Sequence, residues 1–240
     1  MALLLAIALA CTPHGNERVE SFDTAKRLLL QHVYQDHAVT FYCGCSFDAT
    51  KAVDHKACGY VPRNARNQRA GRIEIEHIVP AEAFGRAFPE WRNGHAECVK
   101  KGKSFRGRDC AERVSGRYKL MQADLHNLTP AIGEVNQYRS NYKMAELPGE
   151  ARRFGQCNVE IAAGAIEPSD SIRGDVARTY RYMQQTYCVE LISRRMKRLF
   201  EAWERDDPVD RWECERERRI AKIQGNRNLI VADACRRAGL

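Results

Sequence analysis

The ten cysteines constrain what this 240-residue chain can fold into more than any other feature of its sequence. Most are widely separated, and none forms the CxxC pair typical of zinc sites; the nearest approach is Cys43-Gly44-Cys45. We therefore expect disulfides, with a zinc-stabilised interaction module as the alternative. Because disulfides persist in oxidising compartments, the pattern predicts a protein that works outside the cytoplasm. The ten are Cys11, Cys43, Cys45, Cys58, Cys98, Cys110, Cys157, Cys188, Cys214 and Cys235.

The N-terminus supports this location. Residues 1–10, MALLLAIALA, form an apolar run that ends in a small-x-small pattern, which is typical of signal-peptide cleavage sites. The run is too short to span a bilayer, which takes about 20 residues. We predict a signal peptide over residues 1–10 and a periplasmic or secreted mature protein, with a lipid anchor at Cys11 as the alternative. No later segment is apolar enough to cross a membrane.

The composition favours a folded, nucleic-acid-binding protein. A hydrophobic fraction of 44% is enough to build a core and argues against wholesale disorder. The formal net charge of +8 favours an anionic partner such as nucleic acid and tells against an acidic calcium-binding module. Because no linker interrupts the chain, we expect one domain from about residue 20 to residue 240, acting as a monomer.

The hydrophobic spacing predicts a mixture of helices and strands. Residues 21–36 have helical spacing, with Ser21 or Asp23 as the cap, whereas residues 72–79 alternate as in a half-buried strand. Pro80 ends strand pairing, and the turn of helix after it ends at Gly85. The other expectations are a β-rich segment over 37–47, a loop over 92–116, an extended segment over 117–128, and helices over 129–138, 173–205 and 211–224.

Two segments carry residues suited to phosphodiester cleavage: Arg72-Ile-Glu-Ile-Glu-His77 and Asp124 to Asn136. A neutral imidazole, with a pKa near 6.5, can take a proton from water at neutral pH. Mg²⁺ prefers oxygen ligands and needs only one or two from the protein. We therefore assign His77 as the general base and Glu76 and Asn136 as ligands of a divalent cation, Mg²⁺ first, with Mn²⁺ or Ca²⁺ as alternatives.

The strand geometry sets a condition on this site. Neighbouring residues of a regular strand point to opposite faces, so Glu76 and His77 can share a site only if the strand ends or bulges there. Pro80, three residues on, favours an early end. Glu74 lies on the same strand face as Glu76, and we leave open whether it touches the site or only forms a surface salt bridge.

Six stretches of the chain resemble the endonuclease I family of periplasmic and secreted bacterial nucleases, which carry a ββα-metal (His-Me finger) site. The resemblance implies an α+β fold, a mostly helical single domain around a ββα-metal core, stabilised by disulfides. It gives His77, Glu76 and Asn136 the same roles. It also implies cleavage of DNA, and of RNA, with little sequence preference, to 5′-phosphate and 3′-hydroxyl ends. The stretches are FYCGC (41–45), CGY (58–60), RIEIEHIVPAEAFG (72–85), RYKLMQADLHNLTPAIGEVNQYRSNY (117–142), RGDVARTYRYM (173–183) and WECERERRIAKIQGNRN (212–228).

The resemblance further implies a phosphate-binding arginine in the segment between Cys98 and Cys110. Arg106 is the first candidate and Arg108 the second. Gln122 stands where relatives can carry Glu, which leaves room for an alternative: a secreted nucleic-acid-binding or uptake protein that has lost catalysis.

Eight cysteines lie in family-like contexts and could form four bridges, with Cys98–Cys110 and Cys45–Cys58 as the local pairs. Cys11 belongs with the signal region. Cys188 is extra, and we expect it to be a buried free thiol.

The remaining polar residues near these motifs receive supporting roles. The basic run from Lys100 to Arg108 and the side chain of Arg139 are candidate phosphate contacts. Asn127 could bond the backbone near His77 and so hold the orientation of the ring. His126 is expected to be structural rather than a metal ligand.

Overall fold

The computed structural model describes residues 14–240. The predicted signal peptide and the alternative of a lipid anchor at Cys11 lie outside the described residues. Within residues 14–240, no helix is long and apolar enough to cross a membrane.

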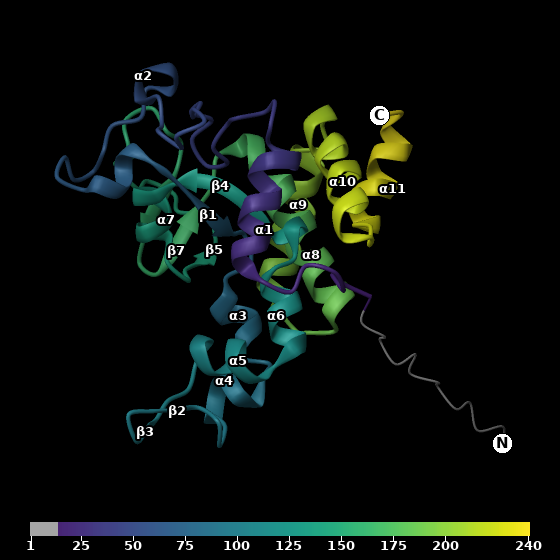
Figure 1. Ribbon diagram of the computed structural model, residues 1–240. Coiled ribbons are helices and arrows are strands. Elements are labelled where there is room, and N and C mark those ends of the chain that lie inside the picture. Colours follow the sequence, from purple (N-terminus) through teal and green to yellow (C-terminus); the bar gives the residue numbers. More distant parts are fainter. Residues whose placement is uncertain (1–13) are drawn as a thin grey trace, which may run out of the picture.

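The described chain is a mixture of helices and short strands, which confirms the predicted α+β class (Figure 1). The α-helices are α1 Phe22–Leu28, α2 His55–Cys58, α3 Ala81–Gly85, α4 Pro89–Asn93, α5 Arg108–Val114, α6 Gly116–Gln122, α7 Gly133–Arg139, α8 Arg173–Tyr187, α9 Arg194–Asp206, α10 Arg211–Gln224 and α11 Leu229–Ala238. The π and 3-10 helices are η1 Leu29–Val33, η2 Gln68–Gly71, η3 Leu125–Asn127 and η4 Asp170–Ile172. The strands are β1 Ile73–His77, β2 Val99–Lys100, β3 Lys103–Ser104, β4 Leu128–Ile132, β5 Lys143–Met144, β6 Glu160–Ala162 and β7 Ala165–Glu167.

An antiparallel pair of strands, β1 and β4, lies at the centre of the functional region. Their register places Glu76 opposite Thr129 and His77 opposite Leu128. The chain leaves β4 directly into α7, so the helix that carries Asn136 starts one residue beyond the sheet. Strand, strand and helix are therefore fixed relative to one another by hydrogen bonds and by chain continuity.

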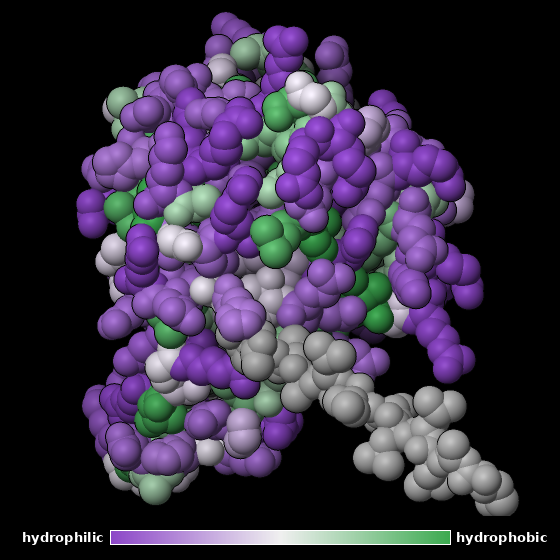
Figure 2. Space-filling model, turned by 90° about the vertical axis from the view of Figure 1, so that its right-hand side faces the viewer, coloured by the Kyte–Doolittle hydropathy of each residue, from purple (hydrophilic) through white to green (hydrophobic). Residues whose placement is uncertain are grey.

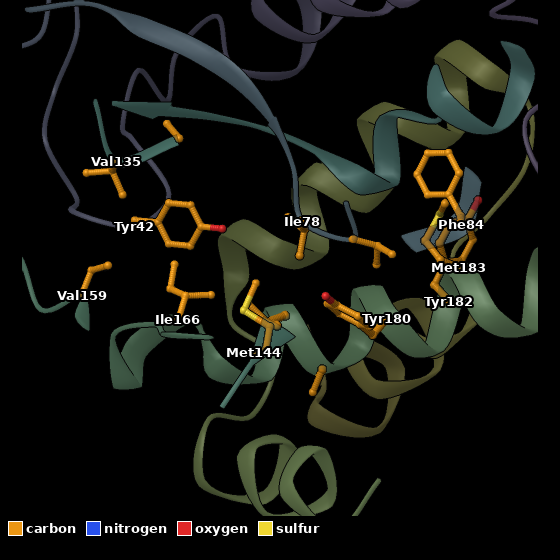
Figure 3. Close-up of a cluster of buried hydrophobic side chains, with 14 of the residues drawn as sticks. Tyr42, Ile78, Phe84, Val135, Met144, Val159, Ile166, Tyr180, Tyr182 and Met183 are labelled. Carbon is orange, nitrogen blue, oxygen red and sulfur yellow. The ribbon is translucent and has the colours of Figure 1, made fainter. Parts of the chain in front are cut away.

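Two hydrophobic clusters flank this unit. Leu128 lies in one cluster with Ala25 of α1, Leu29 of η1 and Ile220 of α10. Ala131 belongs to the larger cluster. Figure 3 shows that this larger cluster runs from Val159 and Ile166 at one end, past Ile78 and Tyr180, to Phe84 and Met183 at the other. Strand β4 is thus packed against both clusters, and close packing of this kind restricts side-chain positions in a neighbouring site.

Helix α1 follows the predicted pattern. Ser21 caps it by accepting a hydrogen bond from the Thr24 N–H. Its buried residue Ala25 continues into the buried Leu29 and Val33 of η1. The helical conformation continues as the π-helical turn η1 and ends at Val33, short of the predicted residue 36.

The segment 117–132 contradicts the prediction, because helix and strand are exchanged. Residues 117–122 lie in α6 (Gly116–Gln122), in which Tyr118 and Met121, three positions apart, are both fully buried. Thr129 and Pro130, predicted to start a helix, lie instead in β4, with Pro130 opposite Ile75. Proline is tolerated in this two-stranded sheet because each strand has a free edge. Pairing with β1 overrides the local helix-start signal, and α7 begins only at Gly133.

Two further predictions of irregular or extended structure are corrected. The predicted loop 92–116 contains the β2–β3 hairpin and α5. Figure 1 shows these elements with α3 and α4 in a lobe that projects from the rest of the molecule. The predicted β-rich segment 37–47 forms only isolated bridges, Val39 with Ser46 and Phe47 with Val53.

The long helix predicted over 173–205 is two helices, α8 and α9. Cys188 ends α8 in the left-handed conformation, with φ 55° and ψ 44°, which a continuing helix cannot contain. Helix α10 spans residues 211–224 and stops at Gly225, as predicted. It is not the last helix, since α11 follows and packs beside it in Figure 1.

Four disulfides join the eight cysteines expected to pair, and the two local pairs are confirmed. The bridges are Cys43–Cys157, Cys45–Cys58, Cys98–Cys110 and Cys214–Cys235. The prediction for Cys188 is wrong on both counts: this residue is exposed and disulfide-bonded. Disulfides in place of thiolate ligands remove the zinc-module alternative.

The molecular face in Figure 2 is mainly hydrophilic, with hydrophobic residues in small separate patches. Among the described residues, the large hydrophobic side chains that are exposed are Val61, Val99, Leu229 and Leu240.

The disulfides should stabilise the fold unequally. Cys43–Cys157 links residues 114 positions apart, whereas Cys98–Cys110 links residues 12 apart. Replacing both cysteines of the long-range bridge by alanine should lower the free energy of unfolding by about 5 kcal/mol, against about 3 kcal/mol for the short one, because the longer loop constrains the unfolded chain more. Urea denaturation of the two double variants measures both losses, and a larger loss for the short-range bridge would contradict this order.

Candidate active site

The three residues predicted to form the site line one cleft. Its volume is about 1170 Å³, and His77, Glu76 and Asn136 are all on its wall. β1 supplies the first two and α7 the third. The strand ends at His77, which satisfies the condition that neighbouring residues reach one site only where regular pleating stops.

The imidazole of His77 is held in one orientation by two contacts. Its Nε2 lies 2.8 Å from the backbone oxygen of Gln122, and the Phe22 ring stacks on it with centroids 4.7 Å apart. A carbonyl oxygen only accepts, so Nε2 carries the proton and Nδ1 holds the lone pair. Nδ1 has no hydrogen-bond partner among residues 14–240 and is not sealed from solvent. The ring is therefore poised to accept a proton at Nδ1.

Burial keeps this imidazole neutral. His77 is only 7% exposed. Burial is the main cause that lowers its pKa to about 3; the hydrogen bond to Gln122 acts in the opposite direction, and the cations of Arg108 and Arg139 also lower this pKa. At neutral pH the imidazole is therefore unprotonated, which is the state that a general base needs.

Glu76 points to the other side of the strand end, into a buried polar cluster. Its Oε1 accepts a hydrogen bond from the Tyr42 hydroxyl, at 3.1 Å, and forms an ion pair with Arg139 Nη1, at 2.8 Å. Burial raises the pKa of this carboxyl, while Arg139, Tyr42 and the His77 N–H act in the opposite direction. Oε2 accepts no side-chain hydrogen bond within residues 14–240, which leaves one oxygen for a further partner.

Arg139 does not have the role predicted from sequence. The side chain is 1% exposed, and it also donates to the backbone oxygens of His77 and Ile78. Its guanidinium is therefore committed to the interior and is not a phosphate contact.

Asn136 forms its side-chain hydrogen bond with Glu74. Its Nδ2 donates to Glu74 Oε2 at 3.0 Å, and Arg69 pairs with the same carboxylate. Burial raises the pKa of Glu74, but the hydrogen bonds from Arg69 and Asn136 outweigh burial and hold this pKa below its usual value. Sequence alternation placed Glu74 on the face of Glu76, but nothing in the sequence pattern indicated its contact with Asn136, 62 positions away.

The two arginine candidates occupy different places. Arg108, the first residue of α5, lies on the cleft wall, donates to Gln122 Oε1 and stacks over Phe22 at 5.2 Å. Arg106 is exposed, bonds the Arg92 carbonyl at 3.3 Å and does not line the cleft. The structure thus brings Arg108, the second candidate, to the site and leaves Arg106 outside it.

Two buried polar residues near the site, Asn127 and His126, have structural roles. Asn127 pairs with Val79 through both backbone atoms: Oδ1 accepts from the N–H at 2.7 Å and Nδ2 donates to the oxygen at 3.0 Å. His126 is buried against Tyr182 and bonds the Asn226 carbonyl, which is a structural role. Phe22 was not singled out from sequence, because a phenylalanine on an amphipathic helix is usually core.

The donor set fits a hard divalent cation. Glu76 offers a carboxylate oxygen. The donation from Asn136 Nδ2 to Glu74 leaves Oδ1 of the same amide as an acceptor. Mg²⁺ needs only one or two such protein oxygens and completes its octahedron with water. Within residues 14–240, no group of three or more His, Cys, Asp or Glu side chains is arranged to hold a metal.

Comparison with known proteins identifies the family. The Endonuclease I family model matches residues 21–235. An extracellular deoxyribonuclease of Aeromonas hydrophila is 39% identical over 98% of this chain and 97% of its own. A periplasmic deoxyribonuclease of the same species is 41% identical over 95% and 92%. Endonuclease-1 of Buchnera aphidicola subsp. Acyrthosiphon pisum is 38% identical over 90% and 82%.

A cleft that joins a neutral imidazole to oxygen donors is an arrangement that hydrolytic enzymes use, and the family matches give the class of enzyme. The chain belongs to the Endonuclease I family and is an endonuclease. The names of the extracellular and periplasmic relatives agree with the location that the cysteines predicted.

The low pKa of His77 makes the stability of the protein depend on pH. Below about pH 6.5 the unfolded chain binds a proton at this histidine, whereas the folded chain does not until about pH 3. The unfolded state therefore gains stability as the pH falls through this window. Between pH 7 and pH 4, the wild type should lose about 3 kcal/mol more stability than His77→Ala.

Urea unfolding in EDTA at the two pH values tests this expectation. Other groups that titrate, such as the buried His126, are common to both proteins and cancel in the comparison. Equal losses in the two proteins would show that His77 is not held neutral by burial.

Proposed function

We propose that this endonuclease is metal-dependent and largely sequence-non-specific, hydrolysing DNA, and RNA as well, to 5′-phosphate and 3′-hydroxyl ends. The observation that carries the proposal is the orientation of His77. Its Nε2–H is fixed by the Gln122 carbonyl, while Nδ1 is left as a base in a cleft that also contains Glu76, Asn136 and Arg108. The names of the relatives, extracellular and periplasmic deoxyribonuclease, support DNA as the substrate.

The residues of the chain would divide the work. His77 Nδ1 takes a proton from water, whose oxygen attacks phosphorus in line with the 3′ oxygen. The new bond joins the water oxygen to phosphorus, and the bond to the 3′ oxygen breaks. The phosphate stays on the 5′ oxygen of the downstream nucleotide, and the departing 3′ oxygen takes a proton from solvent to become a hydroxyl. Glu76 and Asn136 would hold the divalent cation. When bound, the cation neutralises charge on the phosphate and stabilises the departing oxygen.

Arg108 completes the electrostatics of the cleft. Its Nε and Nη2 are held by Gln122, and Nη1 has no hydrogen-bond partner among residues 14–240. Gln122 therefore orients two groups at once, the base through its backbone and the arginine through its side chain. A guanidinium held in this way can bind a phosphate oxygen without sampling other conformations. Contact through phosphates gives affinity without sequence reading.

A cleavage assay tests the proposal. The purified, oxidised protein should convert supercoiled plasmid to nicked and linear forms with Mg²⁺ and leave it intact in EDTA. His77→Ala should cut about 100-fold to 10,000-fold more slowly, the usual contribution of a general base, while still binding DNA. Glu76→Ala should shift the Mg²⁺ dependence to higher concentration. Equal plasmid survival with Mg²⁺ and with EDTA would reject the nuclease mechanism, and binding without cutting over several metals would favour an inactive binding protein.

The two arginines offer a matched pair of variants. Arg108→Ala should lower the cleavage rate by about 100-fold or more, as expected for loss of a donor aimed at developing charge. Arg106→Ala, two residues away and outside the cleft, should change the rate by less than about 3-fold, as for a peripheral phosphate contact. Initial rates on the same plasmid at saturating Mg²⁺ measure both. A larger effect at Arg106 would return the role to the first sequence candidate.

A further inference from the structure

We propose that Glu74 is a positioning residue for the metal site. Its carboxylate fixes the Asn136 amide so that Oδ1, rather than Nδ2, faces the cation. This inference rests on the proposed function, because it assumes that Asn136 is a metal ligand. It adds a residue that the Glu-His-Asn motif does not include.

The hydrogen bonds assign this role to Glu74. An amide can present either its oxygen or its nitrogen to the cleft, and only the oxygen can bind a cation. Glu74 is an acceptor, and its Oε2 lies 3.0 Å from Asn136 Nδ2. The amide nitrogen is therefore turned toward the carboxylate, and the amide oxygen is left for the metal.

Glu74 is not itself available as a ligand. Arg69 engages both carboxylate oxygens: its Nε donates to Oε1 at 2.8 Å, and its Nη2 pairs with Oε2. Arg72 approaches Oε1 at 3.5 Å. Two guanidinium groups thus compensate the charge and fix the direction of the carboxylate, which leaves Glu74 acting through Asn136 alone.

Residues 63–69, which include Arg69, are held against α7 by hydrogen bonds. Glu134, fully buried on α7, accepts hydrogen bonds from the backbone N–H groups of Arg63 and Asn64, each at 3.0 Å. Asn67 bonds both Glu134 and Gln137 of the same helix, and its Oδ1 accepts from the Arg69 N–H. Hydrogen bonds therefore connect α7 to residues 63–69, Arg69 to Glu74, and Glu74 to Asn136 of the same helix.

Gly133 allows the helix to approach this closely. A Cβ on this residue would lie 2.7 Å from the Arg69 backbone oxygen and 3.0 Å from the Glu74 carboxyl carbon. Any side chain at the start of α7 would push the helix away from the carboxylate. The absence of a side chain at position 133 is thus part of the same arrangement.

The test measures Mg²⁺ affinity by isothermal titration calorimetry without nucleic acid, so that no turnover occurs. Glu74→Ala should weaken Mg²⁺ binding by about 10-fold to 100-fold, as for residues that orient metal ligands. Asn136→Ala should weaken it at least as much. Combining the two changes should add less than about 2-fold to the loss caused by Asn136→Ala alone, because Glu74 acts only through that amide. Fully multiplicative losses would show that Glu74 acts on the metal independently and would overturn the inference.

Exchanging the amide of Asn136 and the carboxylate of Glu74 separates an effect on ligand orientation from an effect on folding. Asn136→Asp alone places two carboxylates against each other and should bind Mg²⁺ poorly. Adding Glu74→Gln supplies an amide donor to the new carboxylate, so the double variant should bind Mg²⁺ at least 5-fold more tightly than Asn136→Asp. Glu82→Gln is the matched control, since Glu82 lines the same cleft but pairs with Arg86, and its Mg²⁺ affinity should match that of the parent.

The outcomes for Asn136 and for Glu74 separate the proposed function from the positioning role. Unchanged Mg²⁺ affinity in Asn136→Ala would remove this residue from the metal site and would count against the proposed function. Weaker binding in Asn136→Ala, with no change in Glu74→Ala or no rescue by the exchange, would overturn the role of Glu74 alone.

Discussion

The buried ion pair between Arg139 and Glu76 is the interaction on which the rest of the site depends. The two groups are 2.8 Å apart, and their side chains are 1% and 4% exposed. An isolated carboxylate at this depth would take up a proton rather than remain charged. The same guanidinium donates to the carbonyls of His77 and Ile78, where β1 ends. It therefore fixes the last turn of α7 against the strand end and, with it, the spacing between Glu76 and Asn136.

The sequence predicted the residues of the site more accurately than it predicted the helices and strands that carry them. The alternation over 72–79 identified β1, and the three site residues share one cleft as expected. The exchange of helix and strand over 117–132 had a physical cause. A Thr-Pro pair is a local helix-start signal, but the position of Pro130 opposite Ile75 is decided by a strand more than 50 positions away. Contacts between distant segments also could not be predicted from the sequence. The orientation of Arg108 depends on where α5 starts, and the hydrogen-bond partner of Glu74 lies on α7.

From the sequence alone, Arg139 is compatible with two roles, a phosphate contact or a buried ion pair. One turn beyond Asn136, a cation looks suited to phosphate. In the fold, α7 packs its last turn inward, and the cation meets a carboxylate and two carbonyls instead of solvent. A sequence pattern gives the charge of a residue but not the face of a short helix that will be covered, because that depends on the packing of β1 and Tyr42 against it.

The end of β1 separates two environments with opposite effects on ionisation. On one side, Phe22 and Phe84 surround His77, and burial keeps its ring neutral. On the other side, arginines compensate the carboxylates, Arg139 at Glu76 and Arg69 at Glu74. Residues adjacent in sequence can thus hold a neutral base and a charged ligand site at one pH. A strand end provides this division directly, because successive side chains face opposite surroundings until the pleat stops, and both can then reach a common cleft. In the proposed mechanism, a glutamate and a histidine that are neighbours in sequence therefore act on one phosphate from two different environments.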